Sequence, residues 1–313
     1  MYYNKSGDDM KTTFNIKSSN NKDNLYGAIW PIEGEIKGVI VLLHGLGDKI
    51  DNYEEFAHRM NNLGYVVTGI DQIGFGKTLA DIRQLGYFDD RKNTWKYHID
   101  DTKQLIDKVK TDYPNNNIYL LGISYGSFIA RLFISYYHKE VKGIILIGSS
   151  YISPFNMKIA KFACGYLAVG KGWPDKNTYL YGKTIKKLNN RFEEKKIPSW
   201  LNSNIKYVLD NVDEYSSSRL TISGYYVLYD LIDKVNSKKY IQMIDKEEDI
   251  LLLSGKDDPV TSFSKDVYKV QSLYKKYGIN NVTYKIYNGM RHDLIHETNR
   301  DIVFNDIIKF LQK

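Results

Sequence analysis

The chain contains 313 residues, of which 42% are hydrophobic and 14% aromatic; this is the composition of a folded globular protein and excludes an intrinsically disordered one. Its net charge of +7 comes from lysines and arginines that are dispersed among 37 acidic residues. This dispersed pattern argues against a nucleic-acid partner and leaves at most weak peripheral attraction to an anionic membrane.

The single cysteine and the lack of long apolar runs indicate in which cellular compartment to expect the protein. Cys164 has no second cysteine for an intramolecular disulfide or a cysteine-based metal cluster, which fits a reducing compartment. Residues 1–14 are polar and lack an apolar signal core, and no apolar run approaches the roughly 20 residues of a membrane helix. We therefore expect a cytoplasmic protein, with peripheral contact at the inner membrane surface as the alternative.

Short apolar runs rich in β-branched residues alternate with helical patterns along most of the chain. Two extended stretches at 12–17 and 25–30 come first and flank a turn-forming segment, which predicts an antiparallel hairpin at a sheet edge. The apolar runs that follow lie at residues 39–43, 65–70, 118–121, 144–147, 250–253 and 282–287. This alternation predicts an α/β fold, with a mostly parallel twisted sheet and helices on both faces.

The alternation stops between residues 151 and 247, where helical patterns follow one another without a convincing strand. We expect this segment to be a helical cap inserted after the strand at 144–147, over a core made of residues 1–150 and 248–313. Its first part, residues 155–169, is apolar on nearly every face, so we expect it to be buried against the core. The alternative is that it also lines an acyl-chain tunnel or touches membrane.

The most informative stretch is Gly-Ile-Ser-Tyr-Gly at residues 122–126, which follows an apolar run and precedes a helical pattern. Small residues around a serine allow a sharp strand-to-helix turn, which presents the serine Oγ above the sheet. Because five residues match easily by chance, the surrounding chain must supply the rest of the argument. Ser124 is a candidate nucleophile, which needs a base beside it.

His292 is the candidate base among the six histidines, because it follows the last predicted strand, at the edge where parallel sheets build their sites. His296 is the competitor, although it lies in the following helical segment. Asp258 is the candidate acid that orients the imidazole, since Pro259 biases its backbone away from helix, whereas Asp257 suits a solvent-facing turn. The order serine, aspartate, histidine, each just after a strand, is that of the α/β-hydrolase fold.

An oxyanion hole for a tetrahedral intermediate needs two donors. The candidates are the backbone N–H of Tyr125, which follows the nucleophile, and that of Leu46, in the glycine-rich loop 44–48 after an early strand. We expect His44 to support this loop rather than to transfer protons. The other three histidines fit surface or structural positions in or beside helical patterns: His58, His98 and His138.

Together these residues resemble the bacterial lysophospholipase and monoacylglycerol lipase-like branch of the α/β-hydrolases, which includes serine-aminopeptidase-like members. The resemblance covers about residues 38–313 outside the cap and departs from the family at Ile123, Gln72 and Phe75, where relatives often carry histidine. It implies Ser-His-Asp hydrolysis of acyl esters of glycerol or lysophospholipids, without metal or organic cofactor, under a mobile cap. The motifs that carry it lie at residues 44–48, 53–57, 71–76, 85–88, 122–128 and 289–300.

Aromatic residues of the cap are the candidate lining for an acyl chain, although they could equally pack the cap itself. One alternative function is a short-chain carboxylesterase, thioesterase or peptidase, and another is a non-catalytic lipid-binding protein on the same fold. No cluster of histidine, cysteine and carboxylate has the spacing of a metal site. The candidate substrate-binding residues are Phe155, Phe162, Tyr166 and Tyr225.

Overall fold

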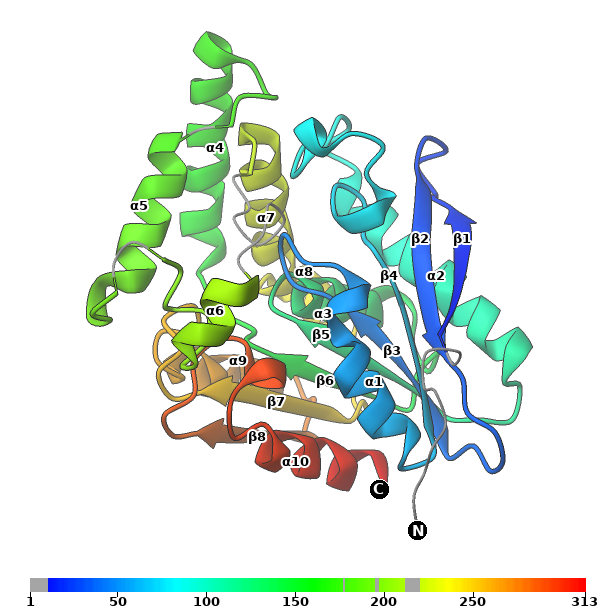
Figure 1. The fold of residues 1–313 in the computed structure, drawn as a ribbon. Helices are drawn as coiled ribbons and strands as arrows, with labels where there is room; N and C mark the ends of the chain where they lie inside the picture. Colours follow the sequence, from blue (N-terminus) through cyan, green and yellow to red (C-terminus); the bar gives the residue numbers. More distant parts are fainter. Residues whose placement is uncertain (1–10, 177, 195–196, 212–219) are drawn as a thin grey trace.

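The computed structural model describes residues 11–176, 178–194, 197–211 and 220–313, so the first ten residues of the predicted core and eleven residues of the predicted cap lie outside the described part. One eight-stranded sheet runs through the molecule in the order β1-β2-β4-β3-β5-β6-β7-β8 (Figure 1). The strands are β1 (Thr12–Lys17), β2 (Asn24–Trp30), β3 (Gly38–Leu43), β4 (Tyr65–Ile70), β5 (Ile118–Ile123), β6 (Gly143–Ile147), β7 (Ile250–Gly255) and β8 (Val282–Tyr287).

The pairing of these strands confirms the predicted mostly parallel sheet with an antiparallel hairpin at its edge. β2 pairs antiparallel with both β1 and β4, and all remaining neighbours are parallel. Successive strand residues point to opposite faces, so Val39 and Val41 join one apolar cluster whereas Ile40 and Leu42 join another. The first cluster includes α2 (Thr94–Asp112), α3 (Tyr125–Tyr136) and α9 (Lys265–Lys276), and the second includes α1 (Glu54–Asn61) and α10 (Asp301–Leu311).

Residues 151–247, called the insertion below, contain five α-helices and no strand in their described part. α4 packs along α7, and α5 stands beside α4 in Figure 1. Two ion pairs connect α4 to α7: Lys161 Nζ of α4 lies 2.8 Å from Asp230 and 2.7 Å from Asp233 of α7. The helices are α4 (Pro154–Lys171), α5 (Thr178–Leu188), α6 (Ile205–Asn211), α7 (Ile222–Val235) and α8 (Lys238–Ile241).

The expectation that residues 155–169 are buried against the core is wrong for one face of α4. Only Met157 and Cys164 of this helix are buried. The helix is apolar on more than one face, and packing on α7 covers only part of its surface, because a helix can bury one stripe against a single neighbour. The large apolar side chains of α4 that remain 54–89% exposed are Phe155, Ile159, Phe162, Tyr166 and Val169.

Arg131 of α3 is buried and connects the core to the start of the insertion and to the end of α7. Its guanidinium donates to the Ser150 carbonyl (3.2 Å), where the insertion begins, and its Nε donates to the Tyr274 hydroxyl of α9 (2.9 Å). At the end of α7 it donates to the Val235 carbonyl (3.1 Å) and the Asn236 Oδ1 (2.8 Å). These bonds satisfy a buried cation and connect the start of the insertion and the end of α7 to α3.

Two glycines allow α3 to approach the ends of β3 and β5. A Cβ on Gly126 would lie 2.0 Å from the Leu43 carbonyl oxygen and 2.8 Å from that of His44, and a Cβ on Gly122 would lie 2.5 Å from the Gly126 oxygen. No side chain fits at either position, because carbon and oxygen cannot approach so closely. The turn between β5 and α3 therefore depends on the absence of two side chains.

We expect Gly126→Ala to destabilise the protein by at least about 2 kcal/mol, because its methyl group collides with the backbone of β3. Chemical denaturation measures the change in the free energy of unfolding. Gly165→Ala in α4 is the matched control, since nothing lies within 4 Å of a Cβ there, and it should leave stability unchanged or raise it by up to about 1 kcal/mol. Equal stabilities of Gly126→Ala and the wild type would contradict the close approach.

Candidate active site

Ser124 occupies the turn between β5 and α3 in a conformation that non-glycine residues rarely adopt. Its φ is 51° and its ψ is −110°, outside the usual regions for an L-residue. Two neighbours hold it there: its N–H donates to the Ile147 carbonyl at 2.8 Å, and its carbonyl accepts from the Ser127 N–H at 2.9 Å and from the Ser127 hydroxyl. Backbone strain that its surroundings enforce in this way is typical of functional positions.

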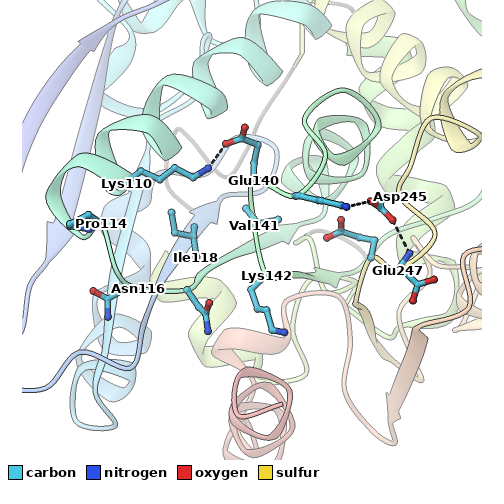
Figure 2. Close-up of a pocket in the computed structure, with 12 residues that line it drawn as sticks. Lys110, Pro114, Asn116, Ile118, Glu140, Val141, Lys142, Asp245 and Glu247 are labelled. Carbon is cyan, nitrogen blue, oxygen red and sulfur yellow. Dashed lines mark hydrogen bonds and ion pairs between the residues drawn. The ribbon is translucent and has the colours of Figure 1, made fainter.

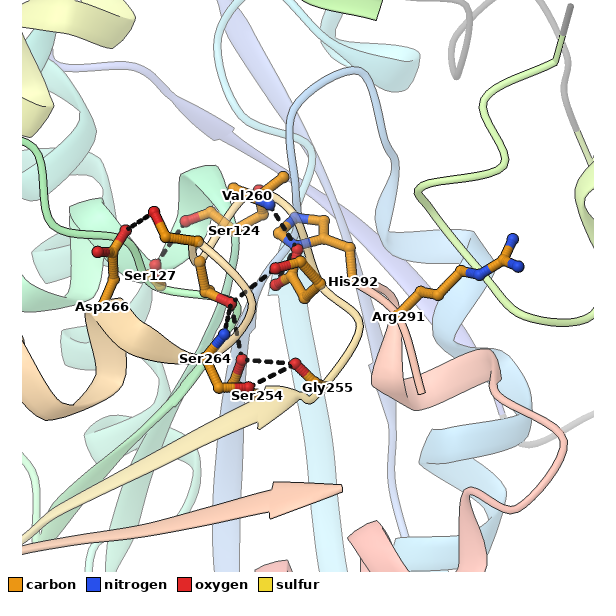
Figure 3. Close-up of polar contacts among 12 residues, drawn as sticks. Ser124, Ser127, Ser254, Gly255, Val260, Ser264, Asp266, Arg291 and His292 are labelled. Carbon is orange, nitrogen blue, oxygen red and sulfur yellow. Dashed lines mark hydrogen bonds and ion pairs between the residues drawn. The ribbon is translucent and has the colours of Figure 1, made fainter. Parts of the chain in front are cut away.

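His292 and Asp258 form a buried hydrogen-bonded pair (Figure 3). The His292 Nδ1–H donates to Asp258 Oδ2 at 2.9 Å, while Asp258 Oδ1 accepts from the Val260 N–H at 2.8 Å. With Nδ1 carrying the proton, the other nitrogen, Nε2, carries a free lone pair. His292 Nε2 is buried and has no hydrogen-bond partner among the described residues. The pair thus presents an imidazole ready to accept a proton.

The end of β6 brings the serine and the histidine to the same edge of the sheet. Ile147, the last residue of β6, accepts the Ser124 N–H, and the next residue is Gly148. A Cβ on Gly148 would lie 2.6 Å from His292 Cε1 and 3.5 Å from Nε2, so the imidazole rests directly on this glycine. One short stretch of backbone therefore contacts both Ser124 and the His292 ring.

The pKa of His292 lies above the ordinary value for histidine. Burial alone lowers this pKa, because an imidazolium loses its hydration, but the charge of Asp258 and its hydrogen bond, with a contribution from Asp293, raise the pKa by more. The net effect makes His292 a stronger base than a free imidazole. It also stabilises the imidazolium that forms once His292 has taken a proton.

The loop before Leu46 lies close to Ser124, and Tyr125 follows Ser124 in the chain. A Cβ on Gly45, the neighbour of Leu46, would lie 3.6 Å from the Ser124 Cβ. Tyr125 is the first residue of α3, so its N–H has no acceptor within the helix. His44 supports the loop as expected: its Nδ1–H donates to the Gly45 carbonyl at 2.8 Å and its Nε2 accepts from the Gln72 N–H at 3.0 Å.

Two other histidines make structural hydrogen bonds elsewhere in the core. Burial, with a smaller effect of His44, lowers the pKa of His98 to about 3, so His98 stays neutral and its Nε2 accepts from the Tyr125 hydroxyl at 2.7 Å. Burial opposes charging of His296, but the Asp293 carboxylate raises its pKa to about 9. Its Nδ1–H donates to Asp293 at 2.8 Å and its Nε2–H to the Asn52 carbonyl at 3.0 Å. Neither ring has a nitrogen available for proton transfer.

The structure does not bring the four predicted substrate-binding side chains together. Phe155, Phe162 and Tyr166 lie on the exposed face of α4, whereas Tyr225 is buried in α7.

Sequence reasoning missed another aromatic residue of the insertion, Trp200, whose ring centroid lies 5.3 Å from that of His292. No local signal marks Trp200, since it follows Pro198 and Ser199 outside any helical or strand pattern.

A groove of about 580 Å³ lies at the opposite end of the sheet (Figure 2). Its walls come from residues at or just before the starts of three parallel strands, including Ile118, Lys142 and Glu248. Burial, with help from Asp245 and Asp249, raises the pKa of Glu248 to about 7. Ser124, Asp258 and His292 all follow the carboxyl ends of strands, so this groove is separate from the candidate site.

Comparisons with known proteins show the family to which the chain belongs. Residues 34–299 match the family described as serine aminopeptidase, S33. Monoglyceride lipase from Mus musculus is 28% identical over 123 residues, which are 39% of this chain and only 38% of the length of that relative. Caffeoylshikimate esterase from Arabidopsis thaliana is 25% identical over 299 residues, which are 90% of this chain and 80% of that protein.

Solved structures extend the likeness to the whole fold. A thermostable carboxyl esterase from Bacillus coagulans, determined in complex with glycerol, has a TM-score of 0.85 and 25% identity, covering 96% of this chain and 98% of that chain. The resemblance predicted from sequence, to lysophospholipase and monoacylglycerol lipase-like α/β-hydrolases, is thus confirmed. With its family match spanning most of the sequence and its sheet and helices arranged as described, the chain belongs to the serine aminopeptidase S33 family and has the α/β-hydrolase fold.

Proposed function

We propose that this protein hydrolyses carboxylic esters with Ser124 as nucleophile, His292 as general base and Asp258 as the acid that orients the imidazole. The observation that carries the proposal is the buried His292–Asp258 pair, with Nε2 unpartnered, at the sheet edge where the strained Ser124 turn also ends. A serine hydroxyl becomes an effective nucleophile only when such a base accepts its proton.

The reaction follows from the roles of these groups. Ser124 Oγ attacks the acyl carbonyl carbon and passes its proton to His292 Nε2, while Asp258 stabilises the imidazolium. The N–H groups of Leu46 and Tyr125 receive the negative charge that develops on the carbonyl oxygen. When the tetrahedral intermediate collapses, His292 protonates the leaving alcohol. Water then attacks the acyl-enzyme, with His292 again as base, and releases the carboxylic acid and free Ser124.

Monoacylglycerols and lysophospholipids are the substrate class that we propose. The family match and the likeness to a monoglyceride lipase support it, as does the buried apolar interior of the insertion, which includes Tyr225. Short-chain esters, thioesters and peptides are the alternatives within the same mechanism. A series of substrates with acyl chains from two to eighteen carbons separates these possibilities, because a buried acyl chain gains affinity with each methylene.

Ser124→Ala should lower kcat by at least about 10⁴-fold, since no other hydroxyl can form the acyl-enzyme. Hydrolysis is measured by release of free fatty acid from monoacylglycerols. Ser135→Ala is the matched control on the same helix, because its hydroxyl only donates to the carbonyl one turn earlier. Retention of most activity by Ser124→Ala would refute the assignment of the nucleophile.

The activity should fall in acid as His292 becomes protonated, because only the neutral imidazole accepts the serine proton. A pKa raised above 6.5 means that protonation begins at higher pH, so the acid limb of kcat/KM should have its midpoint above pH 6.5. Asp258→Asn removes the charge that raises this pKa, so it should shift the midpoint to lower pH as well as slow the reaction. A flat profile down to pH 5 would exclude histidine as the base.

We also propose that α4 contacts an anionic phospholipid surface. Its exposed apolar residues follow one another at spacings of four and three, which places them along one stripe of the helix, and Lys158 and Lys171 flank the stripe. Exposed Lys186 and Lys187 lie on the neighbouring α5. An apolar stripe beside lysines suits the boundary between acyl chains and anionic headgroups. No helix in the described part of the chain is long and apolar enough to cross a membrane.

The double variant Ile159→Asp and Val169→Asp should lose cosedimentation with phosphatidylglycerol vesicles, because it places two charges in the exposed stripe. Hydrolysis of a water-soluble short-chain ester should stay within about twofold of the wild type, since neither side chain is buried. Ile302→Asp on α10, which is also exposed, is the control and should keep vesicle binding. Equal binding of the double variant and the wild type would overturn the membrane proposal.

A further inference from the structure

A short segment of the insertion is bound to the loop that carries His292. Arg291 donates from Nη1 to the Ser199 carbonyl (2.6 Å) and the Asn202 carbonyl (3.2 Å). The Asp293 N–H donates to the Leu201 carbonyl at 2.8 Å, and the Asn202 side chain donates back to the Asp293 carbonyl at 3.3 Å. Residues 199–202 thus follow the backbone on both sides of His292.

A buried carboxylate adds a second connection between the same two segments. Glu297 is 1% exposed, and its Oε1 accepts from the Arg291 N–H at 2.8 Å and from the Ser203 N–H at 3.0 Å. Its other oxygen accepts from the Ser203 hydroxyl. Charge-assisted bonds of this kind impose a defined geometry. The position of Trp200, between Ser199 and Leu201, is therefore set relative to His292 by the backbone.

The Trp200 ring packs against the His292 ring, with centroids 5.3 Å apart and planes inclined by 48°. Trp200 Nε1 and His292 Nε2 are both buried, and neither has a hydrogen-bond partner among the described residues. A buried N–H without an acceptor costs about 1–3 kcal/mol, so the unpartnered Trp200 Nε1 calls for an explanation, and a bound ligand would supply one. The indole can only donate, whereas the neutral Nε2 accepts. A hydroxyl oxygen can accept from the first and its hydrogen can bond to the second, so the two packed rings together offer the partners of hydroxyl groups.

We propose that Trp200 is a substrate-binding residue whose indole N–H donates a hydrogen bond to a hydroxyl oxygen on the alcohol portion of the ester. This inference rests on the proposed function, because the alcohol oxygen that His292 protonates must lie beside the same ring. Esters of glycerol carry further hydroxyls next to the ester oxygen, whereas simple alkyl esters carry none. Trp200 therefore selects polyol esters over alkyl esters with the same acyl chain.

The test compares glyceryl octanoate with ethyl octanoate, which share the acyl chain and differ in the hydroxyls of the alcohol. Trp200→Phe keeps an aromatic ring beside His292 and removes the N–H together with the pyrrole part of the indole. We expect it to lower kcat/KM for glyceryl octanoate about tenfold more than kcat/KM for ethyl octanoate, because loss of packing on His292 affects both esters and loss of the N–H affects only the first. Trp95→Phe is the control: Trp95 packs on Tyr136 and Tyr240, and its replacement should not alter the ratio of the two rates.

Each other outcome overturns the inference in a recognisable way. Equal losses on both esters would assign Trp200 to packing of His292, and no loss on either would remove it from substrate binding. The wild type can also be tested without a variant. It should hydrolyse 2-hydroxyethyl octanoate faster than ethyl octanoate. Equal rates would overturn the role of Trp200 and leave the proposed function standing. Failure of the wild type to hydrolyse any of these esters would overturn the proposed function itself.

Discussion

The close approach of α3 to the ends of β3 and β5 is the constraint on which the candidate site depends. Gly126 and Gly122 allow it because a side chain at either position would overlap backbone atoms. The approach forces Ser124 into a strained turn, and bonds to Ile147 and Ser127 keep it there. The sheet then sets the remaining geometry, because parallel strands end at one edge and their following loops carry Asp258 and His292.

Buried polar groups, in addition to apolar contacts, connect the insertion to this core. Arg131 binds backbone where the insertion begins and where α7 ends, and Glu297 binds the segment around Ser203 to the loop of His292. A buried polar group stabilises only the arrangement that satisfies it, so these connections specify one orientation of the insertion. The insertion thereby contributes Trp200 to the site, while α4 takes no part in these bonds and turns an apolar stripe outward.

Local patterns account for most of what could be predicted. Apolar runs of β-branched residues located the strands, and the turn-forming residues between 12–17 and 25–30 located the hairpin. The choice of His292 over His296 rested on position after a strand, and the structure places His292 against Asp258 while Asp293 and Asn52 occupy both nitrogens of His296. How much of α4 is buried could not be predicted from its sequence. An apolar helix indicates that it packs against a partner, but its sequence does not show how many of its faces that partner covers.

The amino-acid sequence by itself determined the α/β class, the helical nature of the insertion and the identity of the candidate Ser, His and Asp residues. These features follow from short-range rules: side-chain periodicity, turn chemistry and position relative to a strand end. Only the tertiary structure decided that Trp200 lies against His292, that Arg131 binds both Ser150 and the end of α7, and that α4 leaves a stripe exposed. The contacts of Trp200 with His292 and of Arg131 with Val235 join residues about ninety or more positions apart, and no local pattern encodes how such distant segments pack.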